Sequence, residues 1–294
     1  MAVFKGAGVA IVTPMKEDGS INYDMLRTLT DDQIAHHTDA IIVCGTSGEA
    51  PTLDDDEHLE AIRVCVEQAA GRVPVIAGTG SNNTAHAVMM SIEAQKRGAD
   101  GCLLVAPYYN KATQGGLYEH FKTIASAVDI PCIMYNVPSR TGSNILPETA
   151  VRIAKDVDNI VAIKEASGNI SQVVTLAALA EGCIDIYSGN DDQIVPLCSV
   201  GAIGVISVLS NVAPQETHDM VQYCLDGKYE EARALQLKAN ELVKQLFCEV
   251  NPIPVKAALQ MQGFEVGRPR LPLTPMEPAH RENLRKAMQE FGCL

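Results

Sequence analysis

Eight short apolar runs recur along the chain, and most of them are nearly continuous rather than alternating with polar residues. Runs of this kind are typical of strands that are covered on both faces, as in parallel sheets. They occupy residues 8–14, 40–45, 73–80, 101–107, 131–138, 160–167, 184–190 and 201–208. The pattern therefore predicts eight buried strands.

Segments with helical periodicity lie between these runs. Three of them cover residues 24–37, 54–70 and 83–97, and Asp54 and Asn83 occupy the positions of helix N-caps. A strand followed by a helix, repeated eight times, predicts an α/β fold of the (β/α)8 TIM-barrel type. The alternative is an open doubly wound sheet, but the first run ends without the glycine fingerprint of such sheets.

The last part of the chain has helical patterns and no further strand run. Residues 230–247 have the periodicity of a long amphipathic helix. The proline-containing motif at 251–257 is expected to end that helix and start another. These features predict a barrel over residues 1–226 and a C-terminal helical domain over residues 227–294.

Composition and charge narrow the functional classes. The formal charge of −13 over 294 residues argues against a nucleic-acid partner, because phosphates select clustered Lys and Arg. No run approaches the ~20 apolar residues of a membrane helix, and the N-terminal run is too short for a signal peptide. Nine cysteines without a C-x-x-C pair argue against a disulfide framework. We therefore expect a cytoplasmic protein that binds neither nucleic acid nor membrane.

Lys164 is the sharpest catalytic candidate, because it lies inside the sixth run, toward the strand end where TIM barrels place their active sites. Burying an ammonium is costly, and a neutral amine can attack a ketone to form an imine. The alternative is a structural lysine, for which Glu165 is a poor partner because adjacent strand residues face opposite ways. Lys256 is the rival amine, but its place after a proline turn at a helix start predicts a solvated side chain.

Other strand ends carry weaker signals. Tyr135 ends the fifth run and is either a proton-transfer group or a core tyrosine. Arg140 follows in a loop, where it either binds a carboxylate or is an ordinary surface arginine. The segment 45–49 ends the second run with small residues that suit an anion site or a tight turn, while Glu49 excludes a G-x-S-x-G elbow. The seven histidines all fall in predicted helices or loops, so we expect no metal site.

Four motifs together resemble the pyruvate-dependent Schiff-base lyases of the N-acetylneuraminate lyase superfamily, and most closely its dihydrodipicolinate synthase family. They are GTSGE at 45–49, PYYN at 107–110, YNVPSRTG at 135–142 and IKEASGN at 163–169. The resemblance covers the whole chain, including NPIPVK at 251–256 and RLPLTP at 270–275. It implies condensation of pyruvate with L-aspartate 4-semialdehyde in the diaminopimelate and lysine pathway, with no metal or organic cofactor.

The resemblance also assigns roles to residues. Lys164 would form the imine, Tyr135 would relay protons, and Thr46 would link Tyr135 to Tyr109 of a neighbouring subunit in a homotetramer of tight dimers. The substrate-binding positions are Ser47, which stands where the family usually has threonine, Arg140, Gly189 and Ile206. The nearest alternative is a sister aldolase for sialic acid or a 2-keto-3-deoxy sugar acid, and Arg140 argues against it. A catalytically inactive barrel is the alternative from another class, which the intact set of catalytic residues disfavours.

Some members of the family bind lysine, the pathway end product, in a cleft at the tight-dimer interface. The matching positions here are Ala50, Pro51, Asp55, His58, Asn82, His86 and Tyr108. Lysine-sensitive members typically carry glutamate at the position of His86, and an imidazole cannot replace a carboxylate that faces an ammonium. Asn82 and Tyr108 are retained, so the resemblance implies a vestigial site with weak or absent lysine inhibition.

Overall fold

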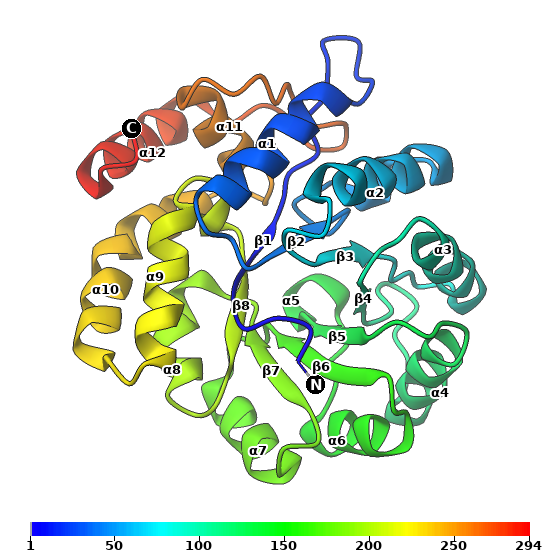
Figure 1. Ribbon diagram of the computed structural model, residues 1–294. Helices are drawn as coiled ribbons and strands as arrows, with labels where there is room; N and C mark the ends of the chain where they lie inside the picture. The colour runs from blue at the N-terminus through cyan, green and yellow to red at the C-terminus, as the bar shows by residue number, and fades with distance from the viewer. Residues whose placement is uncertain (1) are drawn as a thin grey trace.

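In the computed structural model, which describes residues 2–294, eight parallel strands close into a barrel in sequence order (Figure 1). Pairing of the first strand with the last completes the ring. The strands are β1 (Gly6–Ala10), β2 (Ala40–Val43), β3 (Val75–Gly78), β4 (Gly101–Val105), β5 (Cys132–Asn136), β6 (Ile160–Glu165), β7 (Asp185–Ser188) and β8 (Gly204–Ser207). Each overlaps one predicted apolar run, so the predicted TIM barrel is confirmed.

The barrel interior is filled by apolar side chains that alternate with outward-facing ones along each strand. Ile42, Ile133 and Ile206 belong to this interior cluster, which is closed at one end by an aromatic pair. There the rings of Phe4 and Tyr187 stack 4.4 Å apart, and the Tyr187 hydroxyl donates to the Phe4 carbonyl at 2.6 Å. Phe4 precedes β1, so this plug lies toward the N-terminal ends of the strands and leaves the opposite end for a site.

Helices surround the barrel, as Figure 1 shows. Asp54 caps α2 in a reciprocal capping box with Glu57, and the Asn83 side chain accepts from the first turn of α3, as predicted. The helices before the C-terminal extension are α1 (Tyr23–Ala35), α2 (Asp55–Ala69), α3 (Thr84–Lys96), α4 (Gln114–Ala125), α5 (Pro138–Thr141), α6 (Pro147–Asp156), α7 (Ile170–Ala180), α8 (Ile194–Cys198) and α9 (Pro214–Leu225).

The C-terminal extension is helical, with α10 (Tyr229–Leu246), α11 (Ile253–Met261) and α12 (Pro278–Phe291). Its helix α10 lies beside α9 and α12, and α11 also contacts α12 (Figure 1). Leu242 and Met288 of the extension share a hydrophobic core with Val9 of β1. The proposed boundary at 226/227 falls in the turn between α9 and α10, and its status as a domain boundary stays a prediction.

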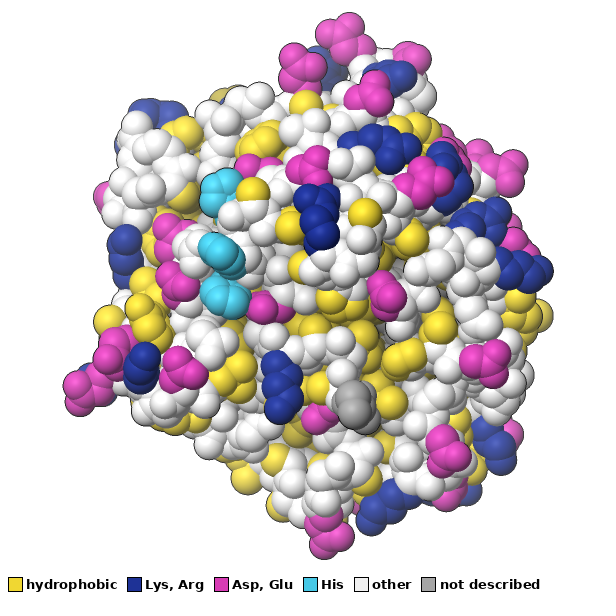
Figure 2. Space-filling model, in the orientation of Figure 1, with side chains coloured by type: hydrophobic (Ala, Val, Ile, Leu, Met, Phe, Trp, Pro, Cys, Tyr) yellow, Lys and Arg dark blue, Asp and Glu magenta, His cyan; other side chains and the backbone are white. Residues whose placement is uncertain are grey.

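The surface on the side viewed in Figure 2 mixes Lys and Arg with Asp and Glu around its rim. On this side, positive and negative side chains lie interspersed rather than gathered by sign. Among the described helices, none combines the length and the apolar character that a bilayer crossing requires.

Candidate active site

The side chain of Lys164 ends inside the barrel mouth, beside Tyr135. The two residues are register partners in the β5–β6 ladder, so their side chains point to the same face. Lys164 is 6% exposed, and its Nζ lies 4.3 Å from the centroid of the Tyr135 ring. Among residues 2–294, no carboxylate lies within ion-pair distance of this amine. Lys164 is therefore not a structural lysine paired with a carboxylate.

A cavity of about 170 Å³ surrounds this pair. It brings together six residues predicted from the sequence, namely Thr46, Ser47, Tyr135, Arg140, Lys164 and Gly189. The remaining lining residues are mostly apolar or come from neighbouring strand ends. The predicted residues therefore converge on one space, although they come from five different segments of the chain.

The loop after β2 carries Thr46 and Ser47 to the cavity. Glu49 adopts a left-handed backbone (φ 56°), and Thr13 Oγ1 donates to the Gly48 carbonyl at 2.7 Å. Ser47 is almost fully buried, and its hydroxyl accepts from Asn251 Nδ2 at 3.0 Å. The loop is thus fixed from two sides, which suits a site whose hydroxyls must keep a defined direction.

Arg140 lies in the short helix α5, directly after β5, and lines the cavity from its outer side. Its guanidinium is exposed and makes no ion pair with a described residue. An arginine in this position can bind a carboxylate through two parallel hydrogen bonds.

A buried polar network that the sequence analysis missed lies behind the Lys164–Tyr135 pair. Asn136 and Glu165, the next residues in the two strands, face outward, and Asn136 Nδ2 donates to Glu165 Oε2 at 3.0 Å. The same amide donates to Asn144 Oδ1 at 2.9 Å, and Gln172 Nε2 donates to Asn144 Oδ1 at 3.1 Å. Glu165 is therefore held by neutral donors, and the prediction that it does not pair with Lys164 is confirmed.

A buried acid, Asp191, also lies close to the site. One oxygen of Asp191 accepts from the backbone N–H groups of Val208 and Leu209, at 3.0 and 2.9 Å. Burial raises the pKa of this carboxyl, while hydrogen bonds and the Lys164 ammonium oppose that shift. No strand-end pattern marked Asp191, because it follows β7 in a short turn of 3₁₀ helix.

Lys256 is not solvated, so that prediction was wrong. Its side chain is 1% exposed, and its Nζ donates to Glu49 Oε1 at 2.5 Å. Burial lowers the pKa of Lys256, and the Glu49 carboxylate opposes that shift. The helix start after Pro252 faces the barrel rather than solvent, which no local pattern could reveal.

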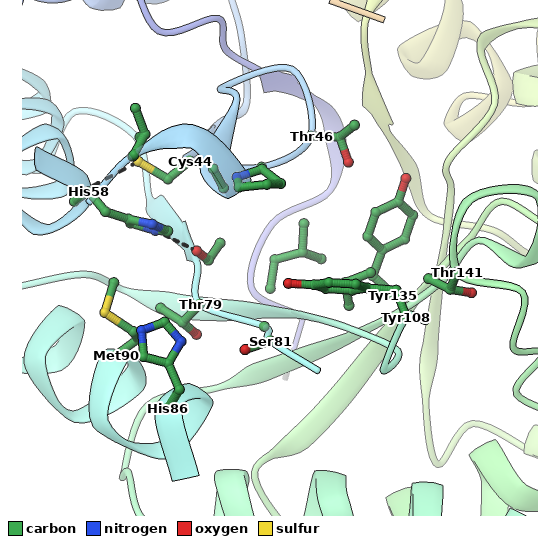
Figure 3. Close-up of a pocket in the computed structure, with 18 of the residues that line it drawn as sticks. Cys44, Thr46, His58, Thr79, Ser81, His86, Met90, Tyr108, Tyr135 and Thr141 are labelled. Carbon is green, nitrogen blue, oxygen red and sulfur yellow. Dashed lines mark hydrogen bonds between the residues drawn. The ribbon is translucent and has the colours of Figure 1, made fainter. Parts of the chain in front are cut away.

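A second cleft, of about 450 Å³, opens next to the first and shares Thr46, Tyr135 and Arg140 with it. Figure 3 shows the hydroxyls of Tyr135 and Thr46 facing the same space, with His58, His86 and Met90 across the cleft. Six of the seven positions predicted for a lysine site line this cleft, namely Ala50, Pro51, Asp55, His58, His86 and Tyr108. The seventh, Asn82, does not line the cleft but contacts a residue that does, since Asn82 Nδ2 donates to the Tyr108 carbonyl at 3.2 Å.

Asp55 and His86, two of the seven positions predicted for a lysine site, already contact each other. His86 Nε2 lies 2.9 Å from Asp55 Oδ1. His58 Nε2 donates to the Gly78 carbonyl at 2.8 Å, and burial lowers the pKa of this imidazole. Asp55, the one carboxylate among the seven positions, is therefore engaged by His86.

Besides Asn82, two predicted residues, Tyr109 and Ile206, line neither cavity. Tyr109 has a left-handed backbone (φ 69°) and is 92% exposed in the single chain, so its contribution to a neighbouring site stays a prediction. Ile206 is buried in the barrel interior cluster together with Tyr135. Three lining residues that the sequence analysis did not single out are Asn190, Phe247 and Asn251. The last two come from the C-terminal extension, whose place over the barrel no sequence pattern indicated.

Comparisons with known proteins give a consistent result. The model of the dihydrodipicolinate synthetase family matches residues 3–291. The 4-hydroxy-tetrahydrodipicolinate synthase of Caldicellulosiruptor bescii is 61% identical over 99% of this chain and 98% of that protein. The solved structure of dihydrodipicolinate synthase from Thermotoga maritima is 43% identical, covers 100% of both chains and has a TM-score of 0.97. That of the Cyanidioschyzon merolae protein with lysine bound is 41% identical, with the same coverage and a TM-score of 0.97.

Proposed function

The chain belongs to the dihydrodipicolinate synthetase family, and from this membership we propose that it condenses pyruvate with L-aspartate 4-semialdehyde to 4-hydroxy-tetrahydrodipicolinate. This is a lyase activity of the Schiff-base aldolase type in diaminopimelate and lysine biosynthesis. The observation that carries the proposal is the position of Lys164. Its buried amine lies beside Tyr135, without a carboxylate at ion-pair distance among residues 2–294, in a cavity that Arg140 and Ser47 also line.

Lys164 opens the reaction by adding its neutral amine to the ketone carbon of pyruvate. Proton transfer to the former ketone oxygen allows water to leave, which gives a protonated imine. Tyr135, whose ring lies against the amine, is the proposed carrier of these protons, with Thr46 as its hydroxyl neighbour. Ser47 and the backbone of its loop are the proposed ligands of the pyruvate carboxylate.

The imine then serves as an electron sink. Loss of a proton from the methyl group gives an enamine, and its terminal carbon attacks the aldehyde carbon of the semialdehyde. The aldehyde oxygen takes up a proton and becomes the hydroxyl of the product. The substrate's own amine finally attacks the imine carbon, the bond to Lys164 breaks, and the ring closes with the lysine regenerated.

The second substrate decides between this activity and the sister aldolases. L-aspartate 4-semialdehyde carries a carboxylate, and Arg140 at the outer side of the cavity is the proposed partner for it. The names of the similar proteins support the semialdehyde rather than a sugar acid. The experiment is a steady-state assay of pyruvate with the semialdehyde and, separately, with sugar aldehydes. Turnover with the sugar aldehydes alone would overturn the proposal.

The working form that we propose is a homotetramer of tight dimers in which Tyr109 completes the partner's site. The side chain is 92% exposed in the single chain and follows Tyr108, which lines the second cleft. The test mixes two inactive variants, Lys164→Ala and Tyr109→Phe, because a mixed dimer would contain one intact shared site. Activity that does not return on mixing, or a Tyr109→Phe variant with normal activity, would contradict the shared site.

The second cleft is the proposed position of a vestigial lysine site. Lysine is bound in the solved Cyanidioschyzon merolae structure, which has the same fold over its whole length. In this chain His86 stands where lysine-sensitive relatives carry a glutamate, and His86 already pairs with Asp55. No unpaired carboxylate among the seven positions remains for the amino acid's ammonium.

A further inference from the structure

We propose that Asn251 of the C-terminal extension is a positioning residue, which keeps the Ser47 hydroxyl directed at the carboxylate of bound pyruvate. The proposal rests on the proposed function and adds a role for the extension to it. Asn251 precedes α11 and lines the same cavity as Lys164 and Ser47.

The hydrogen-bond geometry gives the hydroxyl a direction. Asn251 Nδ2 donates to Ser47 Oγ at 3.0 Å, whereas the alternative contact, from Oγ to Asn251 Oδ1, is longer at 3.4 Å. A hydroxyl has one hydrogen and two lone pairs, so accepting from Nδ2 leaves its own hydrogen available for an anion. Both side chains are more than nine-tenths buried, at 1% exposure for Ser47 and 5% for Asn251.

A buried ion pair fixes the extension to the same loop. Glu49, two residues after Ser47, accepts from Lys256 Nζ at 2.5 Å, and Lys256 lies five residues after Asn251. The other Glu49 oxygen accepts from the backbone N–H of Arg270 at 2.7 Å. The extension therefore contacts the loop at two residues, Glu49 and Ser47. Of these contacts, the one between Asn251 and Ser47 lines the cavity.

Two substitutions separate a directing role from simple packing. Asn251→Ala removes the donor and leaves the hydroxyl without a fixed orientation. Asn251→Asp keeps the shape, but its carboxylate accepts from the Ser47 hydroxyl, turns the hydrogen away from pyruvate and adds a like charge. A directing role therefore predicts that Asp is worse than Ala, whereas a packing role predicts that the isosteric Asp is better tolerated.

The experiment measures imine formation alone. Each variant is incubated with a series of pyruvate concentrations and reduced with borohydride, and the labelled fraction is read from the intact mass. We expect half-maximal labelling to need about tenfold more pyruvate in Asn251→Ala, as for one lost hydrogen bond to a charged group, and still more in Asn251→Asp. Ser47→Ala and the Ser47→Ala/Asn251→Ala double variant should match Asn251→Ala, because the two residues act as a unit.

Gln260→Ala is the matched control, because Gln260 lies in the same extension and donates to the Gly267 carbonyl, away from the cavity. It should label like the unmodified chain. The proposal is overturned if Asn251→Ala labels normally, if Asp is tolerated better than Ala, or if the Ser47 and Asn251 effects multiply in the double variant. Failure of the unmodified chain to label at all would instead overturn the proposed function.

Discussion

Gly189 lies directly against the side chain of Lys164. A Cβ atom placed on Gly189 would stand 3.0 Å from Lys164 Cε, 3.1 Å from Lys164 Cγ and 2.6 Å from the Cβ of Ala166. The first two atoms belong to the amine's own stem, and the third is fixed to the backbone of the loop after β6. The absence of a side chain at position 189 is therefore part of what sets the direction of the Lys164 amine.

The Gly189→Ala variant should form the imine slowly. The added methyl group displaces the Lys164 stem, and a small misplacement of a reacting group lowers rates by about 100-fold. The measurement is the rate of borohydride-trapped label at saturating pyruvate. Gly115→Ala, at a glycine of α4 whose added Cβ would meet nothing closer than 4.0 Å, is the control and should react normally. Normal labelling of Gly189→Ala would remove this residue from the catalytic arrangement.

Arg140→Ala should keep imine formation and lose most turnover with the semialdehyde. The lost contact is a charge-assisted pair worth roughly 1.5–3 kcal/mol, which corresponds to about 10- to 100-fold in kcat/KM. Steady-state kinetics with the semialdehyde varied give the effect, and labelling by pyruvate gives the control measurement. Arg152→Ala, on the neighbouring helix α6, is the matched arginine variant and should change neither. Unchanged kinetics in Arg140→Ala would exclude Arg140 from the site.

Lysine should inhibit the steady-state rate weakly or not at all near neutral pH. His86 Nε2 already contacts Asp55 Oδ1 in the second cleft, so the ammonium of lysine meets no unpaired carboxylate among the predicted positions. His86→Glu should raise lysine affinity by about 10- to 100-fold, as for one restored charge-assisted contact. His36→Glu, an exposed change at the end of α1, controls for net charge and should have no effect. Inhibition of the unmodified chain at submillimolar lysine would refute this prediction.

Stability should fall as the pH drops from about 6.5 to about 4 because of His120. Burial lowers the pKa of this imidazole from 6.5 to about 4. Its Nε2 has no hydrogen-bond partner among residues 2–294, while Nδ1 contacts Thr84 Oγ1 at 2.9 Å. In this pH window the unfolded chain binds the proton and the folded chain does not, so the free energy of unfolding rises with pH. The full effect is on the order of 3 kcal/mol. Urea unfolding across the window measures it.

The matched variant for this measurement is His120→Gln, which keeps a polar side chain near Thr84 but cannot titrate. Its free energy of unfolding should depend less on pH between 4 and 6.5 than that of the unmodified chain. Parallel pH curves for the two proteins would show that His120 is not the group responsible.

The fold could be predicted from the sequence because its signal is local and repeated. Each strand is a short apolar run covered on both faces, and caps such as Asp54 and Asn83 mark helix starts through their own side chains. The structure differs from the prediction at the ends of the helices and strands. The first strand begins at Gly6 rather than at residue 8, because Gly6 and Ala7 pair with Gly204 and Val205 of β8, a contact no local pattern encodes.

Some residues of the candidate site could likewise be predicted from the local sequence, and others could not. Lys164 stood out because a lysine inside an apolar run is locally anomalous. Lys256 did not, because its partner Glu49 lies 207 positions away and the burial of the pair depends on how the extension packs. Asn251 was missed for the same reason, since the Ser47 that it contacts is 204 positions distant. Residues whose environment is made by distant segments cannot be assigned from spacing alone.

Mapping of the pyruvate adduct tests the central claim, imine formation by Lys164, most directly. The chain is incubated with pyruvate alone, reduced with borohydride and digested, and the modified peptide is sequenced by mass spectrometry. We predict one reduced pyruvate group per chain, on Lys164, and no label on a Lys164→Ala variant that folds normally. A label on Lys256, on several lysines to partial extents, or on none would contradict the account.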